Sequence, residues 1–503
     1  MLTENHWLKS TNQFKCLKIK DFGVAYTGPG ALVAVGYMDP GNWATSINGS
    51  QSFQFLLIST ILLSSLMAML LQNLSVKLGI VTQFDLAQAI RLHTDKFLSV
   101  ILWIIAELAI MVTDVTEVIG AAIALNLLFK IPLILATLIT ILDVLFLLFL
   151  SKIGFRKIEI LVSCLIFVIL FIFAYEVILA RPNWINIGSS FLPSSRMLAK
   201  TPVVGGILPL SGSLGIIGAT VMPHNFYLHS GIYQVRKIDS RNQEEIRQAV
   251  KYTEADSNIQ LTIAFIINSL LLIMGAAVFK SGAVRDSSFF GLYDALNNTV
   301  MLSNPILINV AKTGAVSTLF AIALLASGQN PTITGTLTGQ LVMEGFIHLK
   351  MPMWARRLIT RLFSVIPVII CVGLTANDSI AKQHFVLNML MENSQVFLAF
   401  AVPFTIIPLL ILTNNKKLMG EFANSYVVSV LGWSSSLILI FLNLYNLPET
   451  FVTFNFCNPD LAKVVAYLII AIIMFLLVWT CVEMLGVDIS KLQRKFVLSN
   501  RRI

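Results

Sequence analysis

The sequence predicts an all-α integral membrane protein with twelve transmembrane helices. Of its 503 residues, 56% are hydrophobic and only 12% are charged, and the mean hydropathy is +0.81. A soluble globular protein carries about 25% charged residues, so this composition excludes an ordinary soluble enzyme and a disordered chain. Basic loops on one side of a membrane explain the formal net charge of +9 better than nucleic-acid binding does.

Long apolar runs follow one another along the chain, and each can cross a bilayer as a helix of about 20 residues. Because lipid offers no partners to backbone N–H and C=O groups, we expect these runs to be helical. The expected spans are 22–48, 53–76, 98–129, 131–150, 157–180, 203–235, 257–279, 313–345, 357–376, 384–413, 424–446 and 462–486.

The distribution of basic residues predicts that the tails, residues 1–21 and 487–503, are both cytoplasmic. With the N-terminus inside, about three quarters of the 35 lysines and arginines fall in the tails and the even-numbered loops, as expected of cytoplasmic segments. The longest polar insert, 236–256, is then an inner connector. We expect a multi-pass protein of the plasma membrane, surrounded by lipid and monomeric, with no nucleic-acid partner.

Two of the spans contain a proline in the middle of a membrane helix. The first span has Pro40 within 36–42, and the sixth has Pro223 within 218–225. Proline removes a backbone donor and clashes with the preceding turn, so each helix is expected to break there. One such proline is common in membrane helices, but breaks at corresponding places in two halves are typical of inverted-repeat transporters with a site near the bilayer midplane.

The residues at the two breaks offer a mixed set of metal ligands. Asp39 is a carboxylate in the middle of a membrane span, which is costly unless it has a function. Asn42 adds an amide oxygen, Met222 adds a thioether, and Ala219 can offer a carbonyl that the break frees. Mg²⁺ and Ca²⁺ prefer oxygen ligands alone, so this combination favours a divalent transition metal.

These same residues carry a resemblance to a known family. The stretches 39–42 and 219–224 resemble the two signature motifs of the Nramp divalent metal transporters, and 326–345 resembles the long transport signature of that family. The likeness runs from about residue 22 to 415. It implies a LeuT-like fold in which helices 1–5 (22–180) and helices 6–10 (203–413) form an inverted repeat, followed by two extra helices (414–486).

The resemblance also implies a function. Members of this family import Mn²⁺ or Fe²⁺, and we expect Cd²⁺ and Co²⁺ as well, by alternating access coupled to protons. It implies metal ligation by Asp39, Asn42, the carbonyl of Ala219 and Met222, with Gln395 of the tenth helix near the ion. The metal is then the transported substrate and H⁺ the coupling ion, and no resident cofactor is expected.

A proton route is predicted beside the metal site. Glu107, Asp114 and Glu117 lie within about 80° of one another on the third span, and three acids on one helix face need a polar interior. The resemblance aligns Asp114 and Glu117 with the family's proton pathway. We add as candidates the side chains of His224, His229, Arg236 and Arg357. Structural ion pairs between helices remain an alternative for these groups, and Asp143 and Glu176 are interpreted as structural or interfacial.

Three other functions are alternatives to metal import. A sodium-coupled LeuT-fold transporter of a small organic solute is the main alternative, and Met222 argues against it. An intramembrane enzyme lacks an HExxH zinc motif and a phosphate loop in this sequence. A metal channel would not need two broken helices. The five cysteines, which are Cys16, Cys164, Cys371, Cys457 and Cys481, form no CxxC pair and predict neither a disulfide framework nor a zinc site.

Overall fold

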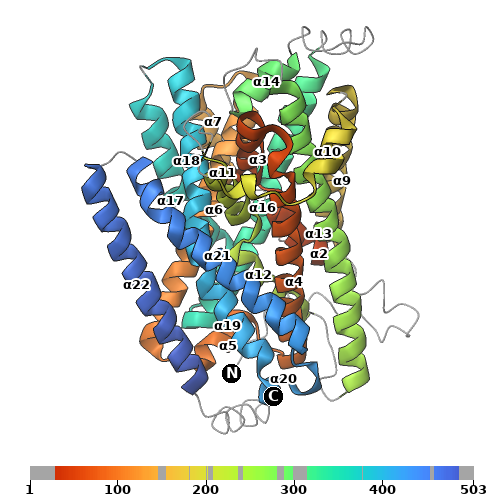
Figure 1. The fold of residues 1–503 in the computed structure, drawn as a ribbon, viewed down its shortest axis with the longest axis vertical. Helices are drawn as coiled ribbons and strands as arrows, with labels where there is room; N and C mark the ends of the chain where they lie inside the picture. The colour runs from red at the N-terminus through yellow and green to blue at the C-terminus, as the bar shows by residue number, and fades with distance from the viewer. Residues whose placement is uncertain are drawn as a thin grey trace.

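The computed structural model describes residues 29–144, 155–180, 182–199, 201, 208–235, 242–279, 288–297, 314–376, 378–453 and 458–486. Within these ranges the chain folds into helices joined by turns, without a β-strand. The all-α fold class predicted from composition is therefore confirmed. Figure 1 shows the helices running roughly side by side, with the cut between the upper and lower halves of several of them near the middle of the molecule.

The elements follow the expected spans in chain order. They are α2 (Pro29–Gly36), α3 (Pro40–Phe53), η3 (Gln54–Leu57), α4 (Ile58–Thr82), α5 (Leu86–His93), α6 (Lys96–Phe129), α7 (Leu133–Ile139), η4 (Thr140–Leu142), α9 (Phe155–Ala180), α10 (Trp184–Ser190), η5 (Ser195–Leu198), α11 (Pro209–Thr220), α12 (Pro223–Ile232), η6 (Tyr233–Val235), α13 (Gln243–Phe279), α14 (Phe289–Asn297), α16 (Ala315–Ile347), α17 (Met353–Leu374), α18 (Ile380–Ala401), α19 (Pro403–Asn414), α20 (Lys416–Met419), η8 (Gly420–Phe422), α21 (Tyr426–Thr453) and α22 (Pro459–Gly486).

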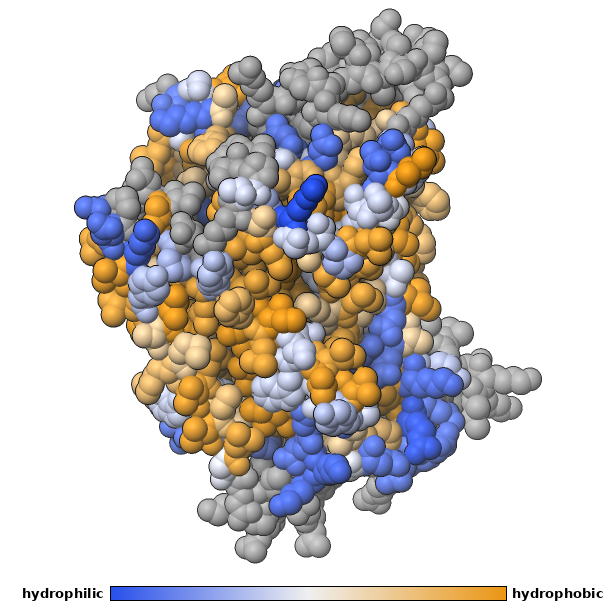
Figure 2. Space-filling view, viewed as in Figure 1, coloured by the Kyte–Doolittle hydropathy of each residue, from blue (hydrophilic) through white to orange (hydrophobic). Residues whose placement is uncertain are grey.

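Several of these elements are long enough to cross a membrane. Within the described ranges, eight helical segments are long and apolar enough to cross a bilayer. Each of the twelve expected spans overlaps a described helix or helix pair. Residues 22–28 of the first, 145–150 of the fourth, 203–207 of the sixth and 313 of the eighth lie outside the described residues. The count of twelve stays a prediction. Figure 2 shows apolar side chains over the middle of the visible face and polar ones toward its upper and lower ends, as a bilayer requires.

Helix breaks divide the molecule into an upper and a lower half. The first span is cut between α2 and α3 and the sixth between α11 and α12, as the prolines predicted. A kink, not anticipated, lies between α18 and α19 at Pro403 in the tenth span, where Val402 keeps helical dihedral angles. In Figure 1 α3, α11 and α18 lie in the upper half of the molecule and α2, α12 and α19 in the lower half. The upper halves contact one another, and so do α2 and α12.

The insert 236–256 is more ordered than expected of a connector. Residues 236–241 lie outside the described residues, but from Gln243 onward the chain is already helical and continues without interruption into the seventh span as α13. Glu244 and Glu245 in the first turn favour a helix start, because acidic side chains interact well with the free N–H groups there. The amide of Gln248 also donates to Glu244 at 2.9 Å, one turn away.

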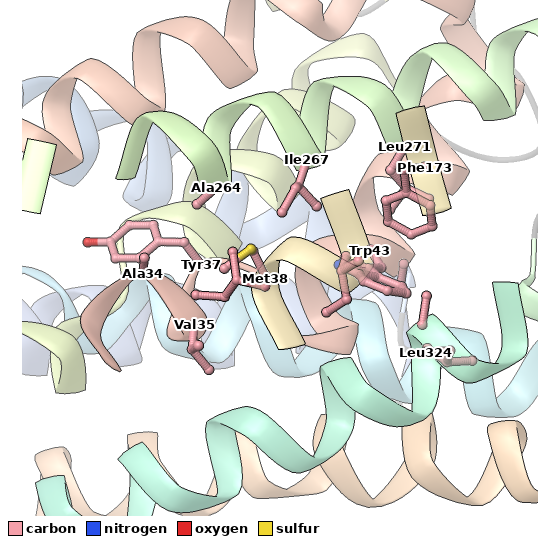
Figure 3. Close-up of a cluster of buried hydrophobic side chains, with 14 of the residues drawn as sticks. Ala34, Val35, Tyr37, Met38, Trp43, Phe173, Ala264, Ile267, Leu271 and Leu324 are labelled. Carbon is pink, nitrogen blue, oxygen red and sulfur yellow. The ribbon is translucent and has the colours of Figure 1, made fainter. Parts of the chain in front are cut away.

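Large apolar side chains fix the chain on either side of the first break. Figure 3 shows Tyr37 and Met38 before it and Trp43 after it, facing side chains of α9, α13 and α16. The Trp43 ring is fully buried and lies 4.8 Å from the ring of Phe173. Burial of aromatic side chains is a large stabilising contribution, so the break is held in a rigid setting.

The carbonyls that the first break frees are satisfied by side chains from two other helices. Asn268 of α13 donates to the Tyr37 carbonyl at 2.8 Å, and Ser327 of α16 donates to the Met38 carbonyl at 2.7 Å. An unpaired buried carbonyl costs about 1–3 kcal/mol. These contacts therefore make the non-helical backbone tolerable at membrane depth.

We predict that Asn268→Ala destabilises the protein by about 1–3 kcal/mol, because it removes the donor to the Tyr37 carbonyl. Thermal unfolding in detergent should show a lowered melting temperature. Gln248→Ala, at a partly exposed position on the same helix, is the matched control and should leave the melting temperature nearly unchanged. Equal melting of the two variants would contradict this account of the break.

Candidate functional site

Asp39 occupies the first break and holds the start of α3. Its carboxylate accepts hydrogen bonds from the backbone N–H groups of Gly41 and Asn42, each at 3.1 Å, and from the Thr116 hydroxyl of α6 at 3.3 Å. Pro40 at the first helical position loses nothing, because that N–H has no helical partner. A helix N-terminus stabilises a negative charge. The Asp39 side chain is thus fully buried, and the backbone N–H groups at the start of α3 stabilise its charge.

The second break lies beside the first. α11 ends at Thr220, and Val221 and Met222 are non-helical before Pro223 opens α12. Asn225, on the first turn of α12, contacts the Met222 sulfur through its amide nitrogen at 3.9 Å. A Cβ placed on Gly36 would lie 2.3 Å from this same amide nitrogen, so Asn225 fits against the end of α2 only because residue 36 is glycine. Asn225 therefore joins the two lower half-helices.

A single amide group connects the two breaks. The Asn42 side-chain nitrogen donates to the Asp39 carboxylate at 2.7 Å and to the Ala219 carbonyl at 2.9 Å. These residues are 177 positions apart in sequence. Asp39 and Ala219 are fully buried, and Asn42 is 3% exposed. The structure thus brings together a carboxylate, an amide and a freed carbonyl in one enclosed place, as the sequence predicted.

The remaining two candidate ligands are also placed here. Met222 is fully buried in the second break, three residues after Ala219. Gln395 of α18 is fully buried, and its amide lies so close to Gly41 that a Cβ on that glycine would be 1.9 Å from the Gln395 nitrogen. The Gln395 side-chain oxygen has no hydrogen-bond partner within the described structure. An acceptor of this kind is costly to bury and is available to a ligand.

The acids of α6 form buried ion pairs with α17. Arg357 contacts Asp114 at 2.5 Å and Glu117 at 3.2 Å, and these three side chains are each 1% exposed. Glu107, two turns before Asp114 on α6, pairs with Arg356, the residue before Arg357 on α17. These contacts direct the three acids toward α17, and they are ion pairs between helices of the kind kept above as an alternative to a proton route.

Two residues outside the predicted proton route complete this cluster, one of them Asp143, which was interpreted from the sequence as structural or interfacial. Asp143, just beyond η4, contacts Arg357 at 3.0 Å and also pairs with Arg361. Arg361 lies 3.7 Å from Glu117 and donates to the Thr332 hydroxyl at 3.0 Å, which in turn donates to Glu117 at 2.9 Å. The cluster of Asp114, Glu117 and Asp143 with Arg357 and Arg361 therefore holds three carboxylates and two guanidinium groups in contact. We call it the charge cluster.

The two candidate histidines lie on α12 but in different surroundings. His229 contacts the Gln72 oxygen at 2.8 Å, and the Gln72 amide donates to the Tyr37 hydroxyl at 2.8 Å. This His229–Gln72–Tyr37 chain crosses α12, α4 and the end of α2. His224 is 3% exposed, two residues after Met222, and its Nδ1 has no hydrogen-bond partner within the described ranges. Arg236, the other candidate on this stretch, lies outside the described residues.

Two broken helices that meet at a buried polar point, inside a bundle of apolar helices, define a membrane transporter of the inverted-repeat class. The chain belongs to the Nramp family, because the model described as "Natural resistance-associated macrophage protein-like" matches residues 30–449. The expected resemblance is therefore confirmed over most of the chain, and the protein is a transporter and not an enzyme.

Individual relatives agree with this assignment. The divalent metal cation transporter MntH of Levilactobacillus brevis is 54% identical over 427 residues, which cover 85% of this chain and 89% of the relative. The solved manganese transporter of Eremococcus coleocola is 56% identical, with a TM-score of 0.88, over 93% of this chain and 96% of that one. Mhp1, a nucleobase-cation-symport-1 family transporter, is 15% identical over 92% of this chain and 93% of that one, with a TM-score of 0.52, and shares the fold. The LeuT-like architecture expected from the sequence is thereby confirmed.

We predict that Arg357→Ala lowers the stability of the protein by about 3–5 kcal/mol, because it leaves buried carboxylates without their cation. Thermal unfolding in detergent checks this. Arg247→Ala is the control, since Arg247 pairs with Glu421 at 3.1 Å on an exposed surface and such pairs contribute about 0–1 kcal/mol. Similar losses in both variants would show that the charge cluster is not held by Arg357.

Proposed function

We propose that this protein imports Mn²⁺ or Fe²⁺ across the plasma membrane by alternating access, coupled to protons. The observation that carries the proposal is the contact of Asn42 with both Asp39 and the Ala219 carbonyl at the meeting point of the two breaks. The names of the MntH relatives and of the Eremococcus coleocola transporter support a divalent metal as the cargo. Cd²⁺ and Co²⁺, which accept the same ligands, are proposed as further substrates.

The proposed ligands are Asp39, Asn42, the Ala219 carbonyl, Met222 and Gln395. In the structure the Asn42 nitrogen, a hydrogen-bond donor, lies between two oxygens that would bind a cation. A cation at this point requires an oxygen from Asn42 in place of that nitrogen, which a half-turn of the amide about its last side-chain bond supplies. The amide thus keeps the oxygens of Asp39 and Ala219 together until the metal replaces its hydrogen bonds.

Met222 gives the proposed site its preference among divalent ions. A thioether is a soft ligand, which Mn²⁺, Fe²⁺ and Cd²⁺ accept more readily than Ca²⁺ and Mg²⁺ do. A sodium-coupled carrier of an organic solute would gain nothing from a buried sulfur at the ion-binding point. The placement of Met222 in the second break therefore favours a transition-metal transporter over a sodium-coupled carrier of an organic solute.

In this structure the half-helices pack against one another both above and below the proposed site. Above it, α3, α11 and α18 contact one another, and below it α2 contacts α12 and the His229–Gln72–Tyr37 chain crosses between helices. We infer that the lower side faces the cytoplasm, because basic residues concentrate in the loops assigned there. Import then requires the upper contacts to open first and the lower contacts to open after metal has bound.

The charge cluster is the proposed proton carrier. It holds one carboxylate more than its guanidinium groups can balance, and a buried charge without a partner is costly. A proton bound within the cluster removes that excess. Thr116 contacts Asp39, and the next residue, Glu117, belongs to the cluster, so the metal site and the proposed proton site are adjacent on α6. His224 and His229 complete the proposed route from α12, and Glu107 with Arg356 extends it along α6 and α17.

The decisive experiment is uptake of Mn²⁺ into liposomes containing the purified protein. We predict that wild-type protein accumulates Mn²⁺ faster when the outside is more acidic than the inside, and that Cd²⁺ competes whereas amino acids do not.

In the same assay, Asp39→Ala should reduce Mn²⁺ uptake to the level of empty liposomes, because it removes the anionic ligand. Asp95→Ala is the control. Asp95 also caps a helix, by accepting from the Leu98 N–H at 2.7 Å, but it is not one of the proposed metal ligands. Wild-type uptake by Asp39→Ala would refute the site.

We predict that Met222→Ala retains part of the Mn²⁺ uptake and gains Ca²⁺ uptake, because the soft ligand is lost and the oxygen ligands remain. Calcium uptake into liposomes, measured beside Mn²⁺ uptake, checks this. Met274→Ala removes a fully buried methionine of α13 away from the breaks and should keep the wild-type preference. If Met222→Ala still excludes Ca²⁺, selectivity does not come from the sulfur.

A further inference from the structure

A carboxylate outside the site described above joins the upper halves of the first and tenth spans. One oxygen of Glu392, on α18, accepts hydrogen bonds from the side-chain nitrogen of Asn48, on α3, and from that of Asn388 at 2.9 Å, one turn earlier on α18. Asn48 and Glu392 are 344 positions apart. Neither residue belongs to a sequence motif that pointed to the metal site.

The position of this carboxylate relative to the metal site follows from helix geometry. Glu392 lies three residues before Gln395, which places it about 4.5 Å along α18, on a neighbouring part of the same face. Asn48 lies six residues after Asn42, which is about 9 Å farther along α3. Both steps lead away from the breaks into the upper half of the molecule, where α3 and α18 contact each other (Figure 1).

Exposure changes along the same path. Gln395 and Asp39 are fully buried, whereas the Glu392 side chain is partly exposed and Asn48 is 7% exposed. Glu392 therefore lies nearer to the surface of the molecule than Gln395 does. An ion that enters between α3 and α18 would meet this carboxylate before it meets Gln395.

Glu392 has no basic partner among the residues that the structure describes. Within the described part of the chain it forms no ion pair, in contrast to Glu107, Asp114 and Glu117. The basic residue Lys382 of the same helix is paired with Asp378 at 2.9 Å. His384 is stacked on the ring of Phe290. A carboxylate with amide neighbours and no cation raises the local concentration of positive ions and speeds their arrival.

We propose that Glu392, with Asn48 and Asn388, forms an outer cation site through which the divalent ion passes on its way to Asp39. This proposal rests on the import function proposed above. The site offers one carboxylate and no sulfur, and the two amides, which donate to Glu392 in this structure, would present oxygens to an ion only after a half-turn about their last side-chain bonds. Such a site accepts hard and soft divalent ions alike and leaves part of their water in place. It recruits ions, and the choice among them is made deeper, where Met222 lies.

The test is the Glu392→Gln variant, because glutamine keeps the size of the side chain and an oxygen that Asn48 and Asn388 can still contact, while the charge is lost. For Mn²⁺ uptake into liposomes we expect KM to rise about three- to ten-fold with kcat unchanged, since charge steering acts on encounter. Calcium in the outer solution should inhibit the wild type competitively, and this inhibition should weaken by a similar factor in Glu392→Gln.

Two outcomes would overturn the proposal. If Glu392→Gln behaves as wild type while Glu392→Ala lowers kcat, the contact is a latch between α3 and α18 and not an ion site. If Glu392→Gln lowers kcat with KM unchanged, the charge does not act on ion entry. Glu421→Gln, an acidic side chain 41% exposed beside α20 in the lower half, is the control for loss of one negative charge and should keep the wild-type KM.

The same measurements separate this proposal from the function it rests on. Absence of Mn²⁺ uptake by the wild type would refute the proposed import function itself. Wild-type uptake that disappears in Asp39→Ala but keeps its KM in Glu392→Gln would refute the outer site alone.

Discussion

Every backbone group that the two helix breaks release must find a partner inside the protein, because lipid offers none. The Asn42 amide meets this constraint at the centre of the molecule, where it contacts both the Asp39 carboxylate and the Ala219 carbonyl. Asn268 and Ser327 meet it for the carbonyls of Tyr37 and Met38. The non-helical backbone is thus stabilised by contacts among α3, α11, α13 and α16. The polar groups of Asp39, Asn42 and Ala219 that make these contacts are also the ones proposed to bind a metal ion.

The sequence was sufficient for the breaks and for their immediate chemistry, because both depend on neighbouring residues. Pro40 and Pro223 interrupt helices by their own covalent structure, and Asp39 lies next to the first of them. The kink between α18 and α19 also follows from a proline, Pro403, although it was not anticipated from the sequence. The acidic first turn of α13 could likewise have shown that the helix begins before the membrane.

Contacts between distant segments could not be predicted in the same way. Asp143 has no motif around it, and its partner Arg361 lies 218 positions away. Arg357 and Arg361 follow a cytoplasmic loop, where basic residues usually determine topology, yet the structure buries both in the charge cluster. The role of Gln395 came from the family resemblance alone, and its fit against Gly41 depends on the packing of α18 on α3. Such pairings are set by three-dimensional packing, which no local pattern records.

Because the proposed ligand at Ala219 is a backbone carbonyl, it limits how metal preference can evolve. It belongs to the main chain, so no single codon change at this position deletes the oxygen that Asn42 contacts. Evolution can alter the proposed cage through the side chains of Asp39, Asn42, Met222 and Gln395, whereas this one ligand is inherited with the fold. Homologues with a different cargo should therefore differ at the side-chain ligands while the break after Thr220 persists.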